Sequence, residues 1–246
     1  MLLRQWREYQ EGQEIYALAE EIAESVPKAE ESERPDELEE PVETPEMPEV
    51  TEEPLQNISV EALREKSSDV VGWIEIPDTD LSYPLMQGKD NDYYLNHAWN
   101  GWESIAGSIF MDYQCSEDLT DFNTIVYGHR MKDSSMFSTL KGYNKLEFWE
   151  DHPIVYIKNG ESVHRYEIFA AYEAPVRSYT YEKKVHDETT RQAVIDFALE
   201  RSVIDTRIIP EASQHILTMS TCTGKGYDSR WVVQAVECTT ENETTM

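Results

Sequence analysis

The chain has 246 residues and a formal net charge of −28, with 49 acidic side chains against 21 basic ones. Binding to nucleic acid needs clustered Lys and Arg for the phosphates, so this composition excludes that class of protein. Three cysteines are too few for a disulfide framework, and their odd number leaves at least one thiol free. No apolar run is long enough to cross a membrane.

Two segments precede the strand-rich part of the chain. Residues 1–25 place apolar side chains at helical spacing, at Ile15, Leu18, Ala19 and Ile22, which predicts a helix. Residues 26–56 are acidic and rich in proline, and such a segment cannot bury enough apolar surface to offset its ordering entropy. We therefore expect a disordered linker, either a plain spacer or an acidic tether that repels an anionic surface, and we expect residues 1–56 to be dispensable for chemistry.

Residues 57–238 carry short apolar segments separated by turn signals, which predicts a mainly β fold, a barrel or a sandwich. A short helix is expected at 59–66 with Ser59 as its N-cap, a helical stretch at 135–150, and a helix at 187–199 capped by Asp187. The polar residues 239–246 form a tail that should fray. The expected strands are 71–76, 81–86, 107–111, 124–128, 153–158, 163–172, 215–220 and 230–237.

Three residues with complementary chemistry stand at the ends of predicted strands. Cys222 ends one strand, Arg230 opens the next, and His129 follows a third just after a glycine. A thiolate is a nucleophile, an imidazole moves protons, and a guanidinium suits an anionic intermediate. Taken one by one, they could instead be a buried thiol, a loop histidine and a surface charge. Together they indicate a cysteine enzyme.

Several motifs in the same order resemble the sortases, the cysteine transpeptidases of Gram-positive cell surfaces, and class B in particular. Residues 218–222 resemble the sortase pattern Thr-Leu-x-Thr-Cys, with Met219 in place of Leu. Two departures are Ser134, where the family often has Gly, and Thr223, where some members carry an acidic residue. The other matching segments are 71–77, 83–85, 87–97, 107–112 and 127–137, and the resemblance covers about residues 68 to 237.

The resemblance implies an eight-stranded β-barrel with an N-terminal helix and a helix inserted between the sixth and seventh strands. Cys222 would be the nucleophile that forms a thioacyl enzyme, His129 the proton donor and acceptor, and Arg230 the group that stabilises the oxyanion or holds the substrate backbone. The acyl group of a sorting motif would pass to an amine of a peptidoglycan precursor or a pilin. Weaker candidates for substrate binding are Asn91, Tyr127, Ser220 and Thr221.

The resemblance also implies anchorage by an N-terminal transmembrane helix at the extracellular face of the cell membrane. Residues 1–25 would then be a juxtamembrane segment that follows a span missing from this chain. The alternatives are an intrinsically soluble protein, a pilin-polymerising sortase, a cysteine hydrolase of the same fold, or a non-catalytic surface-binding module. We expect no metal and no cofactor, since the remaining histidines lack metal-ligand spacing. These histidines are His97, His152, His164, His186 and His215.

Overall fold

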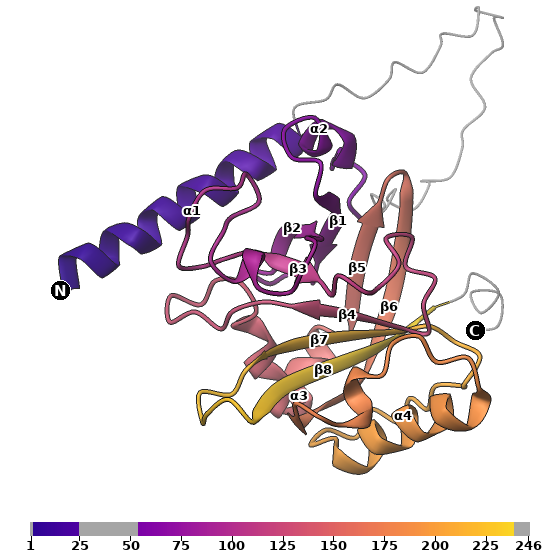
Figure 1. The fold of residues 1–246 in the computed structure, drawn as a ribbon. Coiled ribbons are helices and arrows are strands. Elements are labelled where there is room, and N and C mark those ends of the chain that lie inside the picture. Colours follow the sequence, from indigo (N-terminus) through magenta and orange to yellow (C-terminus); the bar gives the residue numbers. More distant parts are fainter. Residues whose placement is uncertain (1, 25–53, 239–246) are drawn as a thin grey trace, which may run out of the picture.

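The computed structural model describes residues 2–24 and 54–238, and in them eight strands close into a barrel (Figure 1). The eight-stranded barrel that the resemblance implies is confirmed, although β6 and β7 run further than expected. Most of the linker and residues 239–246 lie outside the described residues. The strands are β1 (Val70–Glu75), β2 (Ser82–Met86), β3 (Ile109–Met111), β4 (Asn123–Tyr127), β5 (Ile154–Asn159), β6 (Ser162–Pro175), β7 (Ile216–Cys222) and β8 (Ser229–Glu237).

The strand order β1-β2-β3-β4-β7-β8-β6-β5 decides which strand ends meet. β4 and β7 are parallel neighbours, and β8 runs antiparallel to β7. The carboxyl ends of β4 and β7 and the start of β8 therefore lie at one rim of the barrel. These are the ends that carry His129, Cys222 and Arg230.

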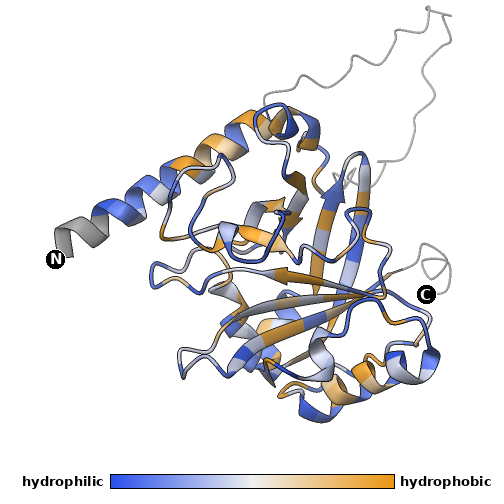
Figure 2. Cartoon of the chain, in the orientation of Figure 1, coloured by the Kyte–Doolittle hydropathy of each residue, from blue (hydrophilic) through white to orange (hydrophobic). Residues whose placement is uncertain are grey.

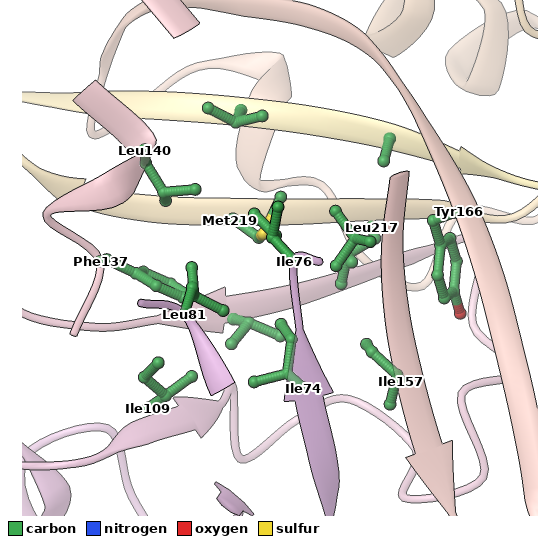
Figure 3. Close-up of a cluster of buried hydrophobic side chains, with 14 of the residues drawn as sticks. Ile74, Ile76, Leu81, Ile109, Phe137, Leu140, Ile157, Tyr166, Leu217 and Met219 are labelled. Carbon is green, nitrogen blue, oxygen red and sulfur yellow. The ribbon is translucent and has the colours of Figure 1, made fainter. Parts of the chain in front are cut away.

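The barrel is filled by side chains that alternate along the strands, as the period of two requires. Ile74 of β1 and Leu217 and Met219 of β7 are fully buried in this core, and Figure 3 shows them pointing into the same interior. Met219 is 0% exposed, so the apolar exchange at this motif position keeps a core side chain. The packed strand fixes the backbone that leads to Cys222.

Helices and 3-10 turns cover the outside of the barrel. The insertion predicted between the sixth and seventh strands is confirmed as α4, where Asp187 accepts a hydrogen bond from Thr190 N at 2.8 Å and caps the helix. Its residues Val194, Ile195 and Ala198 are buried against the barrel. The helical elements are α1 (Leu2–Glu24), α2 (Val60–Arg64), η1 (Tyr93–Leu95), η2 (Thr139–Asn144), α3 (Leu146–Asp151), η3 (Tyr179–Tyr181) and α4 (Glu188–Arg201).

The N-terminal helix α1 packs against the barrel. In the coloured part of α1, Figure 2 shows mainly hydrophilic residues first and more apolar ones toward the C-terminal end, where Ala19 and Ala23 are buried. Ser59 N donates to Ala23 O at 2.9 Å and joins α1 to the chain before α2. Leu55, two residues before the expected start of the domain, is also buried, in the same cluster as Ala19 and Ala23. Its carbonyl oxygen accepts a hydrogen bond from Lys158 Nζ at 3.3 Å. Two parts of residues 1–56, the segment expected to be dispensable for the chemistry, thus contact the domain: α1 and Leu55.

Neither described stretch contains a helix long and apolar enough to span a membrane.

Candidate active site

Cys222 is the last residue of β7, and its side chain is exposed at the rim of the barrel. The six residues before it in the strand are all buried. A well-packed strand holds its last side chain more precisely than a loop would. The thiol is therefore both accessible and fixed in position.

His129 lies two residues beyond the end of β4, beside the end of β7. In the parallel ladder, Tyr127 pairs with Ser220. Gly128 N donates to Ser220 O at 3.3 Å, and Thr221 Oγ1 donates to Gly128 O at 2.7 Å. These bonds tie the backbone before His129 to the strand that carries the thiol.

Gly128 is required for space and not for a sharp turn. Its φ is not positive, so Gly128 does not adopt the left-handed conformation that favours glycine. A Cβ on Gly128 would lie 2.9 Å from the ring of Phe137. The close approach of this buried ring brings the chain onto the barrel just before His129.

A hydrogen bond joins the Cys222 thiol and the His129 imidazole, and it sets the charge of both groups. It lowers the pKa of Cys222 below its ordinary value and raises the pKa of His129. Burial opposes both shifts but is outweighed, and the nearby Arg230 and Arg130 lower the pKa of Cys222 further. The arrangement favours a thiolate paired with an imidazolium, a nucleophile with its proton donor beside it.

The other contact of His129 is with a main-chain carbonyl. Nε2 of the ring lies 2.6 Å from Leu95 O. A carbonyl oxygen only accepts hydrogen bonds, so Nε2 carries a proton and the ring is held in one orientation. Leu95 takes the place that a carboxylate or amide side chain holds in other catalytic triads.

Arg230 pairs with Cys222 across the antiparallel ladder of β7 and β8. Its Nη1 donates to Tyr227 O and to Ser229 O, both at 2.9 Å. These two bonds hold the guanidinium at the base of the β7–β8 turn. A cation in this position can stabilise negative charge that develops near the sulfur.

Of the two residues before Cys222, neither leaves its hydroxyl without a protein partner. Thr221 is 2% exposed, and its hydroxyl serves the Gly128 carbonyl. The Ser220 hydroxyl is also buried and shares a hydrogen bond of 3.0 Å with Tyr181 OH. The structure thus places Thr221 against the main chain just before His129, and it places Ser220 next to Tyr181 of η3.

Asn91 and Tyr127 meet at a carboxylate that the sequence did not single out. Asn91 Nδ2 and Tyr127 OH each donate to Asp112 Oδ2 at 2.9 Å, and Lys183 Nζ lies 3.0 Å from the same atom. Burial opposes the charge of Asp112, but hydrogen bonds led by Gln114 N hold its pKa below the ordinary range. The four side chains form one network around the buried Asp112 carboxylate, near the rim.

Sequence reasoning missed Asp112, Lys183, Tyr181, Arg130 and the Leu95 carbonyl. Asp112 ends one of the family-like segments, and Lys183 begins a pair of lysines in an acidic chain, so each left a weak signal. The contribution of the Leu95 carbonyl has no residue signature, because every residue has a carbonyl. Only the fold brings these groups to the site.

The other cysteines and histidines lie apart from this pair. Cys115 and Cys238 are free thiols. His97 stacks on the ring of Tyr93 at 3.9 Å, and His164 and His215 both contact Glu237. Over residues 2–24 and 54–238 there is no group of three or more His, Cys, Asp or Glu that could hold a metal ion.

Comparison with known proteins identifies the family to which this site belongs. A model of the sortase domain matches residues 74–238. Sortase B of Listeria monocytogenes is 38% identical over 174 residues, which cover 70% of this chain and 71% of that protein. Sortase B of Staphylococcus aureus is 33% identical over 162 residues and 66% of each chain.

Solved structures agree with this relationship. Sortase B from Bacillus anthracis in complex with AAEK1 aligns with a TM-score of 0.75 at 32% identity, over 94% of this chain and 98% of that chain. The Staphylococcus aureus sortase B–substrate complex aligns with a TM-score of 0.69 at 32% identity, over 74% and 85% of the two chains. The chain belongs to the sortase family, and its relatives place it in class B. It is a cysteine transpeptidase that acts on the sorting motifs of surface proteins.

Proposed function

We propose that Cys222, His129 and Arg230 carry out the transpeptidation by two acyl transfers. The Cys222 thiolate attacks the carbonyl carbon of the scissile peptide bond, and Arg230 stabilises the oxyanion of the tetrahedral intermediate. His129 gives its proton to the departing amine as the C–N bond breaks, which leaves a thioester on Cys222. The first half-reaction thus ends with a neutral imidazole.

An amine then completes the cycle. Its nitrogen attacks the thioester carbonyl, His129 takes the proton that the nitrogen loses, and the thiolate departs as the C–S bond breaks. The observation that carries the proposal is the hydrogen bond between Cys222 and His129 with Arg230 directly across the ladder. After the second transfer Cys222 is again a thiolate and His129 again an imidazolium, so the two groups are ready for the next turnover.

The donor substrate is a sorting-motif peptide, and the acceptor is an amine of the peptidoglycan precursor. Sortase B structures have been solved with a substrate and, separately, with triglycine, a peptide with a free amino terminus. We propose that Tyr181, which bonds to the buried Ser220 hydroxyl, lines the peptide groove. In the same proposal Ser220, Asn91, Tyr127 and Thr221 shape the site from beneath, because their polar side-chain atoms bond to the protein.

We further propose that the domain works at the extracellular face of the cell membrane, held there by an anchor on the N-terminal side of α1. The domain boundaries that go with this proposal are a juxtamembrane helix at 1–25, a linker at 26–56, the catalytic domain at 57–238 and a tail at 239–246. Leu55 and α1 belong structurally to the catalytic domain. A test is whether a membrane-attached form of the chain is labelled by a thiol reagent that cannot enter the cell.

Mass spectrometry tests the chemistry directly. The protein is mixed with a panel of sorting-motif peptides, and an adduct of acyl mass is sought on Cys222. Addition of triglycine should convert the adduct into a ligated peptide. An adduct that only hydrolyses, whatever amine is added, would favour the cysteine hydrolase, and failure of every peptide to cleave or form an adduct would favour the non-catalytic module.

A further inference from the structure

Residues 93–108, here called the bracket, lie between α1 and the rim that carries His129. The bracket begins with η1 and ends where β3 starts, and Figure 1 shows this part of the chain beside α1. Its Leu95 carbonyl holds the His129 ring at 2.6 Å. The position of this carbonyl therefore depends on what fixes the bracket.

Part of the fixation is internal to the bracket. Ser108 N donates to Tyr94 O at 2.8 Å, and Ser108 Oγ donates to His97 O at 2.9 Å. Gly107 has a φ of +58°, and a Cβ there would lie 2.5 Å from Tyr94 O and 2.7 Å from Leu95 O. The end of the bracket thus packs directly under the carbonyl groups at its start, where only glycine leaves enough room.

The rest of the fixation comes from α1. The Tyr16 hydroxyl donates a short hydrogen bond to Gly107 O and lies 3.2 Å from Ser108 Oγ. From the residue before it, Ile15 O accepts a bond from Trp99 Nε1 at 2.9 Å. Two neighbouring residues of α1 therefore hold the bracket at two points, and Tyr16 holds the two residues that support Leu95.

We infer that Tyr16 is a positioning residue for transpeptidation, which acts through Gly107 and Ser108 on the Leu95 carbonyl and through that carbonyl on His129. The inference rests on the proposed role of His129. It gives α1 a part in the chemistry, because a shift of α1 moves the group that orients the proton donor. Small misplacements of a catalytic group have large effects on rate, since the reaction needs a near-attack geometry.

The consequence for His129 can be separated from a loss of stability. The charged or titratable groups that face the His129–Cys222 pair are Cys222 itself on β7, Arg230 on β8 and Arg130 next in the chain. None of them contacts Tyr16. Loosening of the bracket should therefore remove only the Leu95 acceptor, which favours the imidazolium, and the pKa of His129 should fall.

The matched experiment compares Tyr16→Phe with Tyr143→Phe. Tyr143 is fully buried whereas Tyr16 is partly buried, and the Tyr143 hydroxyl likewise donates to a main-chain carbonyl, His152 O at 2.7 Å, but it does not touch the bracket. Each variant is assayed for peptide cleavage across pH, and the His129 ring is titrated by nitrogen-15 NMR. Thermal melting of both variants reports the common loss of a buried hydrogen bond.

Tyr16→Phe should lower kcat roughly tenfold with an unchanged KM and should shift the His129 titration to lower pH. Tyr143→Phe should show a similar loss in Tm with neither effect. Equal His129 titrations in the two variants would overturn the inference. If Tyr16→Phe does not fold, Ser108→Ala takes its place, with the same expected and overturning results.

The two proposals fail in different ways. The NMR titration of His129 tests the effect of the bracket on this ring even if the enzyme uses another histidine. If the Tyr16 variant shifts this titration but peptide cleavage does not depend on His129, the proposed catalytic role of His129 is wrong, whereas the positioning of His129 by Tyr16 through the bracket is supported. If cleavage depends on His129 but the Tyr16 variant leaves the His129 titration unchanged, the inferred positioning role of Tyr16 is wrong.

Discussion

Cys222 and Arg230 lie directly opposite each other on adjacent antiparallel strands. The eight-residue separation in sequence becomes a single cross-strand pair, because the turn at 223–229 folds β8 back along β7. A cross-strand pair at the end of a ladder has a nearly invariant spacing. This is a rigid way to keep a cation beside a nucleophile without burying either of them.

Replacement of Arg230 should show whether this cation acts on the reaction. Arg230→Ala should reduce the rate of acylation by an amount equivalent to about 2.7–4 kcal/mol, the usual effect of losing one oxyanion donor. Arg230→Lys should restore little, because Nη1 alone donates to Tyr227 O and Ser229 O, and an ammonium lacks the further donors of the planar guanidinium. Single-turnover kinetics of acyl-enzyme formation would measure both variants. Wild-type rates in Arg230→Ala would remove Arg230 from the mechanism.

The activity should have a bell-shaped dependence on pH. The pKa of Cys222 is lowered and that of His129 is raised, so both shifts favour the thiolate–imidazolium form of the pair. Activity is lost on the acid side as the thiolate gains a proton, and on the alkaline side as the imidazolium loses one. Arg230→Ala should move the acid limb to higher pH, because it removes a charge that lowers the pKa of Cys222.

The matched control for the bell is His164→Gln. His164 lies on β6 and contacts Glu237, and it has no part in the candidate site. His129→Ala should nearly abolish turnover and flatten the profile, whereas His164→Gln should leave its shape unchanged. Initial rates of peptide cleavage from acid to alkaline pH give the comparison. A bell that survives His129→Ala would mean that another group donates the proton.

The sequence already contained most of the fold and the reacting groups of the site. The alternation of apolar side chains predicted all eight strands, and the caps at Ser59 and Asp187 were predicted and are present. The sequence could not separate Ser220 from Thr221, because it shows that neighbouring residues face opposite sides but not what lies on each side. The network at Asp112 joins residues far apart in the chain, so no local pattern could indicate it.

Ser134 departs from the glycine that the family often has, and the structure shows the cost. It has a φ of +72°, in the left-handed region, and its side chain is exposed. This conformation costs an L-residue roughly 1–2 kcal/mol. Glycine avoids that cost, but it also gives the unfolded chain more conformational freedom, which offsets part of the gain in stability. Ser134→Gly should therefore raise the free energy of unfolding by about 0.5–1 kcal/mol. Urea denaturation would measure it.

The control for Ser134→Gly is Ser138→Gly, at a residue whose φ is −65° and whose hydroxyl donates to Met131 O at 2.7 Å. That change removes a hydrogen bond and relieves no strain, so it should destabilise the protein. A decrease in stability for both variants would show that the conformation at Ser134 is not strained.

Removal of α1 should destabilise the protein. This helix buries Ala19 and Ala23 and bonds to the bracket through Ile15 and Tyr16. Deletion of residues 1–24 should therefore expose apolar surface of the barrel and lower the Tm by several degrees. Differential scanning calorimetry would measure the change, and an unchanged Tm would mean that the contacts of α1 contribute little to stability.

Deletion within the linker should have a different effect. The ends of the linker lie close together, because Ala23 O accepts from Ser59 N at 2.9 Å. Deletion of residues 30–50 keeps enough chain to close this short gap and shortens the loop, which lowers the entropy cost of closure slightly. That variant should melt at or just above the wild-type temperature and cleave peptide within a few fold of the wild-type rate. A loss of Tm equal to that of the α1 deletion would mean that the linker also packs on the domain.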